Sequence, residues 1–286
     1  MTSSKFQILV PIDFSEQSVF AFNQSCRIAL LYDADITLLH VIENESACFI
    51  EHKVDTQKAL FDKIDKKIKL FVEEELAISK KVVSCRIEIG EVVHYIIEIQ
   101  KQQKFNMIVM GFNELKNTPH KQIGRNSMEV IKHAPCQVIT VKNNIRSGEF
   151  KSIILPLDLT KPLNQKVDKA IELAKTWKGA IVTILSILPP CDELRVNAST
   201  HQLAGIVRQI ELNNIVCNAE IIRMIRGHES MADIVVDYVQ RIKSEMVMLI
   251  TRHETGIANR LGVAAQSIIN NVEIPMFSIV PLVNQN

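Results

Sequence analysis

Hydrophobic and polar positions follow two patterns that alternate along the chain. Residues 6–12 form an apolar run, which is typical of a β-strand covered on both faces. Leu60, Ile64, Ile68 and Phe71 lie three or four positions apart, which is typical of an amphipathic helix. Strands and helices are therefore expected to alternate. Such an order requires crossover connections and a mostly parallel sheet.

The first half of the chain predicts five strands with a helix between each pair. Ser15 is a favourable N-cap for the first of these helices. The expected strands are 6–12, 35–42, 81–89, 107–110 and one from residue 136, and the expected helices are 16–31, 55–78, 92–102 and 124–133.

The second half repeats the first. The runs 8–13 and 153–158 both end in Pro, one apolar residue and Asp, and the closing segments 135–141 and 275–280 also correspond. A repeat of this size is a whole domain rather than a solenoid unit. We expect domains at 1–143 and 151–286, joined by a linker at 144–150. The expected strands of the second copy are 151–157, 180–187, 216–225, 246–250 and 276–281, and its expected helices are 161–177, 197–213, 229–242 and 260–271.

The composition of the chain narrows the range of possible functions. The chain has 286 residues and a net charge of +1, so it lacks the basic excess of most nucleic-acid-binding proteins. No apolar run reaches the roughly 20 residues that span a bilayer, and the N-terminus has no signal-peptide pattern. Its six cysteines form no CxxC pair and are expected to be reduced and mostly buried. We therefore expect a cytoplasmic protein that binds neither nucleic acid nor membrane.

Residues that are candidates for ligand binding lie where the strands of the first half end. In an open parallel sheet, ligands bind at the carboxyl ends of the strands. Those ends carry Asp13, Val41 and Met110-Gly111, and a polar loop then leads to Gly124 at a helix start. Backbone N–H groups at a helix N-terminus bind anions, phosphate above all. The alternative is that both glycines only mark turns.

These segments resemble the universal stress protein family, and the resemblance covers essentially the whole chain. It rests on residues 10–16, 38–43, 108–111 and 132–136. The resemblance implies a tandem of two Rossmann-like domains with five-stranded sheets of order 3-2-1-4-5, similar to the adenine nucleotide alpha-hydrolase fold. Family members commonly dimerise through the last strand. A tandem chain is thus expected to form an intramolecular pseudo-dimer, with a homodimer of chains as the alternative.

Some members of the family bind ATP through the pattern G-x2-G-x9-G followed by Ser or Thr. Gly111 and Gly124 match the first and third glycines, but Glu114 and Arg125 replace the second glycine and the Ser or Thr. The resemblance implies that the first copy binds ATP, with Mg, or another adenine nucleotide. Val41 would contact the adenine, Asp13 the ribose, and the loop from Gly111 to Ser127 the phosphates. The implied site comprises Pro11, Ile12, Asp13, Val41, Met110, Gly111, Asn113, Gly124, Arg125, Asn126 and Ser127.

The second copy departs further from this pattern. Thr251 replaces the first glycine, Arg252 follows it, and Gly262 lies two residues too close. Only Asp158 remains at the end of the first strand. This copy is expected not to bind ATP in the family's way and to serve as the pseudo-dimer partner. Arg252 at a strand end leaves some other small anion as an alternative.

Simpler roles compete with each of these candidates. Asp13 and Asp158 could cap helices or brace loops, and His40 is expected to be structural, since no second ligand stands at metal spacing. The Lys-rich stretch 63–69 is typical of a solvated helix face.

No G-x-S-x-G elbow, Walker A sequence or nucleophile–base pair is present, so an enzyme is not expected, with slow ATP hydrolysis left open. Two hypotheses follow: a nucleotide-responsive stress protein with an unidentified protein partner, or an interaction scaffold that binds no nucleotide.

Overall fold

Two compact units make up the described chain, one up to residue 144 and one from residue 150. They are called domain 1 and domain 2 below. The computed structural model describes residues 5–43, 54–75, 83–112, 124–144, 150–159, 164–190, 193–224, 230–250 and 262–280.

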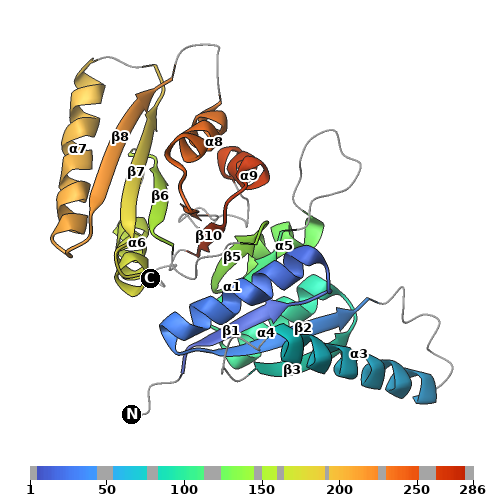
Figure 1. Cartoon of the computed structure of the whole chain (residues 1–286). Coiled ribbons are helices and arrows are strands. Elements are labelled where there is room, and N and C mark those ends of the chain that lie inside the picture. Colours follow the sequence, from blue (N-terminus) through green and yellow to red (C-terminus); the bar gives the residue numbers. More distant parts are fainter. Residues whose placement is uncertain are drawn as a thin grey trace. The chain divides into compact units, whose positions relative to one another are not determined.

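Domain 1 is a five-stranded parallel sheet with helices on both faces (Figure 1). The strand order is β3-β2-β1-β4-β5, which is the order that the resemblance implies. Its elements are β1 (Gln7–Pro11), α1 (Glu16–Tyr32), β2 (Asp35–Ile42), α3 (Val54–Glu75), β3 (Val83–Ile89), α4 (Val92–Gln103), β4 (Met107–Gly111), α5 (Arg125–His133) and β5 (Gln137–Val141).

Strand β1 lies at the point where the strand order reverses. Ile8 pairs with Ile36 of β2 on one side and with Met107 of β4 on the other. Helix α1 packs against β1 and β4, whereas α4 packs against β2 and α5. Ile8, Leu9 and Val10 are fully buried, as expected for a parallel strand that is covered on both faces. Because β1 lies between β2 and β4, the carboxyl ends of these three strands lie next to one another at one edge of the sheet.

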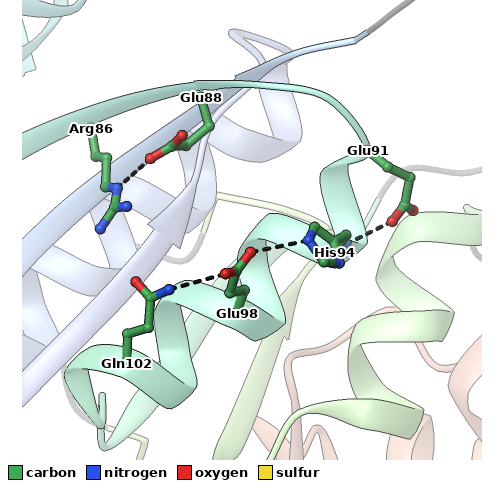
Figure 2. Close-up of polar contacts among 6 residues, drawn as sticks. All are labelled: Arg86, Glu88, Glu91, His94, Glu98 and Gln102. Atoms are coloured by element: carbon green, nitrogen blue, oxygen red, sulfur yellow. Dashed lines mark hydrogen bonds and ion pairs between the residues drawn. The ribbon is translucent and has the colours of Figure 1, made fainter.

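The turn from β3 into α4 is set by one glycine and one cap. Gly90 has φ +146°, and a Cβ there would lie 2.7 Å from a ring carbon of Tyr95. Glu91 caps α4 by accepting a hydrogen bond from the backbone N–H of His94 at 2.8 Å. The chain of contacts continues along α4, where Glu98 contacts His94 and Gln102, each at 3.0 Å (Figure 2). These exposed contacts support the helix start that the sequence predicts.

Domain 2 repeats the architecture with the order β8-β7-β6-β9-β10. Pro156 pairs with Leu185, as Pro11 pairs with Leu39 in domain 1. Its elements are β6 (Ser152–Leu157), α6 (Asn164–Thr176), β7 (Ile181–Leu188), α7 (Glu193–Glu211), β8 (Cys217–Arg223), α8 (Met231–Ile242), β9 (Met246–Ile250), α9 (Val263–Asn271) and β10 (Met276–Ile279).

The boundaries of domain 2 contain most of the errors of the sequence prediction. The helix predicted over 197–213 is α7, which begins four residues earlier at Glu193 and ends at Glu211. Its first turn lacks the apolar periodicity because Leu194 is 79% exposed, and an ion pair between Glu193 and Arg223 at 2.9 Å holds that turn instead. Strand β8 is also shorter than the predicted 216–225, since Val216 and Met224 lie outside it.

A capping box sets the start of α8, which was predicted over 229–242. Ser230 lies outside the helix as its N-cap and accepts a hydrogen bond from the N–H of Asp233, whose carboxylate accepts one from the N–H of Ser230. Two donors that a helix end would otherwise leave without partners are thereby satisfied. Similarly, the helix predicted from residue 260 begins at Val263, with Gly262 as its N-cap.

Burial differs between Trp177 and the cysteines, which were predicted to be mostly buried. Trp177 is fully buried with its ring 4.9 Å from that of Phe150, so it packs the core of domain 2. Among the cysteines in the described ranges, Cys26 and Cys217 are buried, but Cys85 is exposed on the edge strand β3. None of the described helices combines the length and the apolar character that crossing a membrane requires.

The capping box makes the stability of domain 2 depend on pH. Hydrogen bonds from the Ser230 side chain and backbone lower the pKa of Asp233. Stability from this group is therefore present above the unfolded pKa near 4 and is lost as pH falls through the lower folded pKa. We expect Asp233→Asn to cost about 0.5–1 kcal/mol at pH 7 and progressively less below pH 4. Urea unfolding followed by fluorescence of the single tryptophan, Trp177, measures this.

The matched control is Asp237→Asn, at an exposed position in the middle of the same helix. Asp237 takes no part in the capping box, so this substitution should cost less at pH 7 than Asp233→Asn. A cost of Asp233→Asn that stays constant between pH 7 and pH 3 would contradict the pH linkage.

Candidate nucleotide site

The carboxyl ends of β1, β2 and β4 bring most of the predicted site residues to one edge of domain 1. Pro11 is the last residue of β1 and pairs with Leu39. The N–H of buried Ile12 then donates to the Leu39 carbonyl at 2.9 Å, which continues the pairing beyond the strand. Val41, half-buried, lies near the end of β2. These residues form the wall against which a ligand at this edge would lie.

Asp13 is exposed at the top of β1 and braces the loop that leads into α1. Its Oδ1 accepts hydrogen bonds from the Ser15 N–H at 2.9 Å and from the Ser15 hydroxyl at 2.6 Å. The Ser15 hydroxyl in turn accepts from the N–H of Ser18 as the N-cap of α1. The loop-bracing role considered for Asp13 is thus present. Its carboxylate remains on the exposed edge, where a ligand could reach it.

An aromatic clasp, composed of Phe14, His40, Lys67 and Phe71, holds the same loop. The Phe14 ring lies 5.3 Å from that of His40 and 6.1 Å from that of Phe71, between ring centroids. The Lys67 Nζ lies 3.7 Å from the Phe14 centroid, a cation–π geometry. The sequence pattern predicts only a solvated helix face at Lys67. In the structure, Lys67 also contacts the Phe14 ring.

His40 has a structural role, as predicted. Its Nδ1 is 2.7 Å from the carbonyl oxygen of Ile12, directly before Asp13. A histidine in this position ties the second strand to the loop above the first. Among the described residues, no three His, Cys, Asp or Glu side chains gather closely enough to hold a metal ion.

Gly111 is required by packing, whatever ligand the site takes. A Cβ at Gly111 would lie 2.7 Å from the backbone carbonyl carbon of Gln17 and 2.8 Å from the backbone nitrogen of Ser18. The first turn of α1 thus passes directly over the end of β4. On the carbonyl side, buried Ser127 donates its hydroxyl to the Gly111 oxygen at 3.1 Å, which joins β4 to the first turn of α5.

Helix α5 begins at Gly124 without a side-chain cap. The first N–H groups of a helix have no partner within it, and within the described part of the chain no hydrogen bond engages those of Arg125, Asn126 and Ser127. Arg125 is exposed and Asn126 half-buried. Asn113 and Glu114 lie outside the described residues, so their part in the predicted loop is untested.

The corresponding edge of domain 2 has a different chemistry. Asp158 is half-buried after β6, and Gly262 again begins a helix without a side-chain cap, but Val263 follows it and is 87% exposed. Ser186 occupies the place of His40, since it pairs beside Leu157, and its buried hydroxyl has no hydrogen-bond partner among the described residues. Thr251 and Arg252 lie outside the described ranges.

Comparison with known proteins agrees with this architecture. A family model described as the universal stress protein family matches residues 6–142 and again residues 149–279. The chain belongs to the universal stress protein family. Both matches together make it a tandem of two universal stress protein domains, and the predicted family and α/β fold class are confirmed.

Individual universal stress proteins resemble one or both halves. A Staphylococcus aureus protein with the family name is 27% identical over 153 residues, which cover 50% of this chain and 88% of that protein. The crystal structure of a universal stress protein from Archaeoglobus fulgidus has a TM-score of 0.75 at 17% identity, over 96% of this chain and 98% of that one. A Pseudomonas aeruginosa structure of the same family has a TM-score of 0.67 at 16% identity, over 96% and 93%. Both structures support the shared fold.

The packing around Gly111 predicts a large stability effect at a residue that a nucleotide motif would assign to the ligand. Gly111→Ala should destabilise domain 1 by about 2–3 kcal/mol, because backbone atoms of α1 must move to admit the methyl group. Urea unfolding followed by circular dichroism should show the loss in the absence of nucleotide.

The contrasting substitution is Gly205→Ala, in the exposed interior of α7, where a Cβ meets no atom within 4 Å. It should stabilise domain 2 by about 0.5–1 kcal/mol through helix propensity. If both substitutions changed the free energy of unfolding only slightly and by similar amounts, α1 would not press on Gly111 in solution.

Proposed function

We propose that domain 1 binds an adenine nucleotide, ATP with Mg²⁺, as a regulatory ligand, and that the protein is not an enzyme. One observation carries the proposal. Asp13, the ends of β2 and β4, and the uncapped N-terminus of α5 belong to the same edge of one parallel sheet. This edge at the strand-order reversal is where open α/β sheets bind ligands.

The chain supplies a suitable group for each part of a nucleotide. The apolar end of β2 at Val41 offers a surface for the base, and the exposed Asp13 carboxylate can accept hydrogen bonds from ribose hydroxyls. The N–H groups in the first turn of α5 and its positive dipole end suit the phosphates. When bound, Mg²⁺ would partly neutralise the phosphate charge.

Charges near the phosphates tune this site relative to the family pattern. Glu114 would repel phosphate, whereas the exposed Arg125 on the first turn of α5 would attract it. We therefore expect a weaker nucleotide site than a complete glycine pattern would give. In domain 2, the exposed Val263 replaces the polar residue after Gly262, so nucleotide binding is assigned to domain 1 alone.

Ligand binding would act as a signal that a protein partner senses at this edge of domain 1. In this scheme domain 2 serves as the pseudo-dimer partner of domain 1. No catalytic base is assigned, so any ATP hydrolysis would be slow.

The second candidate is an interaction scaffold that binds no nucleotide. Two observations favour it. Gly111 is explained by α1 packing, and Asp13 by its hydrogen bonds with Ser15, so neither residue needs a ligand to account for it.

Calorimetric titration of nucleotide-stripped protein with Mg-ATP separates the candidates. Gly124→Asp places a carboxylate over the N–H groups of α5 while supplying a favourable N-cap, so the helix itself is not weakened. We expect one site per chain in the natural protein and at least about tenfold weaker binding in this variant, from charge repulsion and blocked donors.

The matched control is Gly262→Asp, the same change at the equivalent helix start of domain 2, which should leave the titration unchanged. Absence of heat with ATP, ADP and AMP at high-micromolar protein would refute the nucleotide proposal and leave the scaffold. Loss of binding in both variants would refute the assignment to domain 1.

A further inference from the structure

The backbone of Phe14 stands in a conformation that its neighbours must maintain. Its φ is +63°, in the left-handed region that bulky residues rarely adopt. Such conformations persist where surrounding contacts over-determine them, and they concentrate at ligand sites. Phe14 lies between Asp13 and the α1 cap Ser15, so whatever holds Phe14 also holds both of these residues.

Two of the contacts that hold Phe14 come from α3, more than fifty residues further along the chain. Phe71 meets the Phe14 ring edge-on, and Lys67 covers it from one turn earlier on the same helix. Phe71 also lies 5.1 Å from Phe22, a fully buried residue of α1, so it is anchored in the core behind the loop. Helix α3 otherwise packs against β3, at the edge of the sheet (Figure 1).

From this geometry we infer that Phe14 is a positioning residue for Asp13, and that the aromatic clasp couples the ligand loop to α3. With Phe14 clasped, Asp13 keeps its hydrogen bonds to Ser15 and presents its carboxylate at the sheet edge. With the clasp open, the left-handed turn is no longer maintained and the carboxylate is released.

The ligand part of the inference rests on the nucleotide site proposed above. Because coupling is reciprocal, a nucleotide on Asp13 would strengthen the docking of α3, and undocking of α3 would weaken nucleotide binding. Helix α3 would thereby be the element that carries the bound state to a partner.

Four variants test the clasp. Lys67→Met removes the cation from an exposed position and keeps an apolar stem, so the protein should fold normally. Lys67→Arg restores the cation over the ring. Phe14→Gly removes the ring while allowing positive φ. Ile28→Val removes a buried methylene group from a later turn of α1, at a residue outside the clasp.

Hydrogen exchange gives a readout that needs no ligand. The amides of Ser15 and Ser18 bond to Asp13 and Ser15 side chains, so their exchange reports the loop. Lys67→Met should speed their exchange several-fold although the change lies in α3, and Phe14→Gly should speed exchange along α3. Lys67→Arg should restore the natural rates.

Affinity for Mg-ATP gives the second readout. Phe14→Gly should weaken binding about tenfold and Lys67→Met about threefold, within the usual range of coupling between sites. Ile28→Val should lower the unfolding temperature yet keep affinity within about twofold, which separates positioning from general destabilisation.

The two proposals fail in different ways. Natural protein that binds no nucleotide refutes the proposed function, and exchange alone then decides the clasp. Unchanged Ser15 and Ser18 exchange in Lys67→Met, or an affinity loss in Ile28→Val as large as that in Phe14→Gly, overturns the inference.

Discussion

The parallel pairing of β1 with β4 is the constraint on which the architecture of domain 1 depends. Both strands are buried on both faces, so the chain must leave each of them into a covering helix. Right-handed crossovers send the connections on either side of β1 to opposite faces of the sheet. The exposed carboxylate of Asp13 stands at the carboxyl end of β1, where the chain turns into α1.

The fold was predictable because its strands and helices follow local patterns of apolar residues in the sequence. The continuous apolar run 107–110 corresponds to the buried parallel strand β4. The three- and four-residue spacing from Leu60 to Phe71 corresponds to helix α3. The errors in the predicted boundaries arose where the structure departs from the local pattern of apolar residues. Leu194 points into solvent, so the first turn of α7 has no apolar stripe, and an ion pair with β8 maintains it instead.

The candidate site was predictable only as far as topology determines it. Asp13, Val41 and Gly111 end strands, and the ends of parallel strands meet at one edge. The clasp could not be predicted, because it joins Phe14 to residues of α3 that are remote in sequence. A phenylalanine between two favourable turn residues gives no signal of left-handed backbone. Sequence spacing likewise does not reveal how closely α1 passes over β4.

Gly111 bears on how membership in a ligand-binding subgroup is judged. Its missing side chain accommodates the backbone of α1, and Ser127 fastens its carbonyl, so both matter to folding with or without a ligand. A substitution at Gly111 would thus be costly for folding even in a relative that binds no ligand. The presence of this glycine alone therefore does not mark a ligand-binding member of the family.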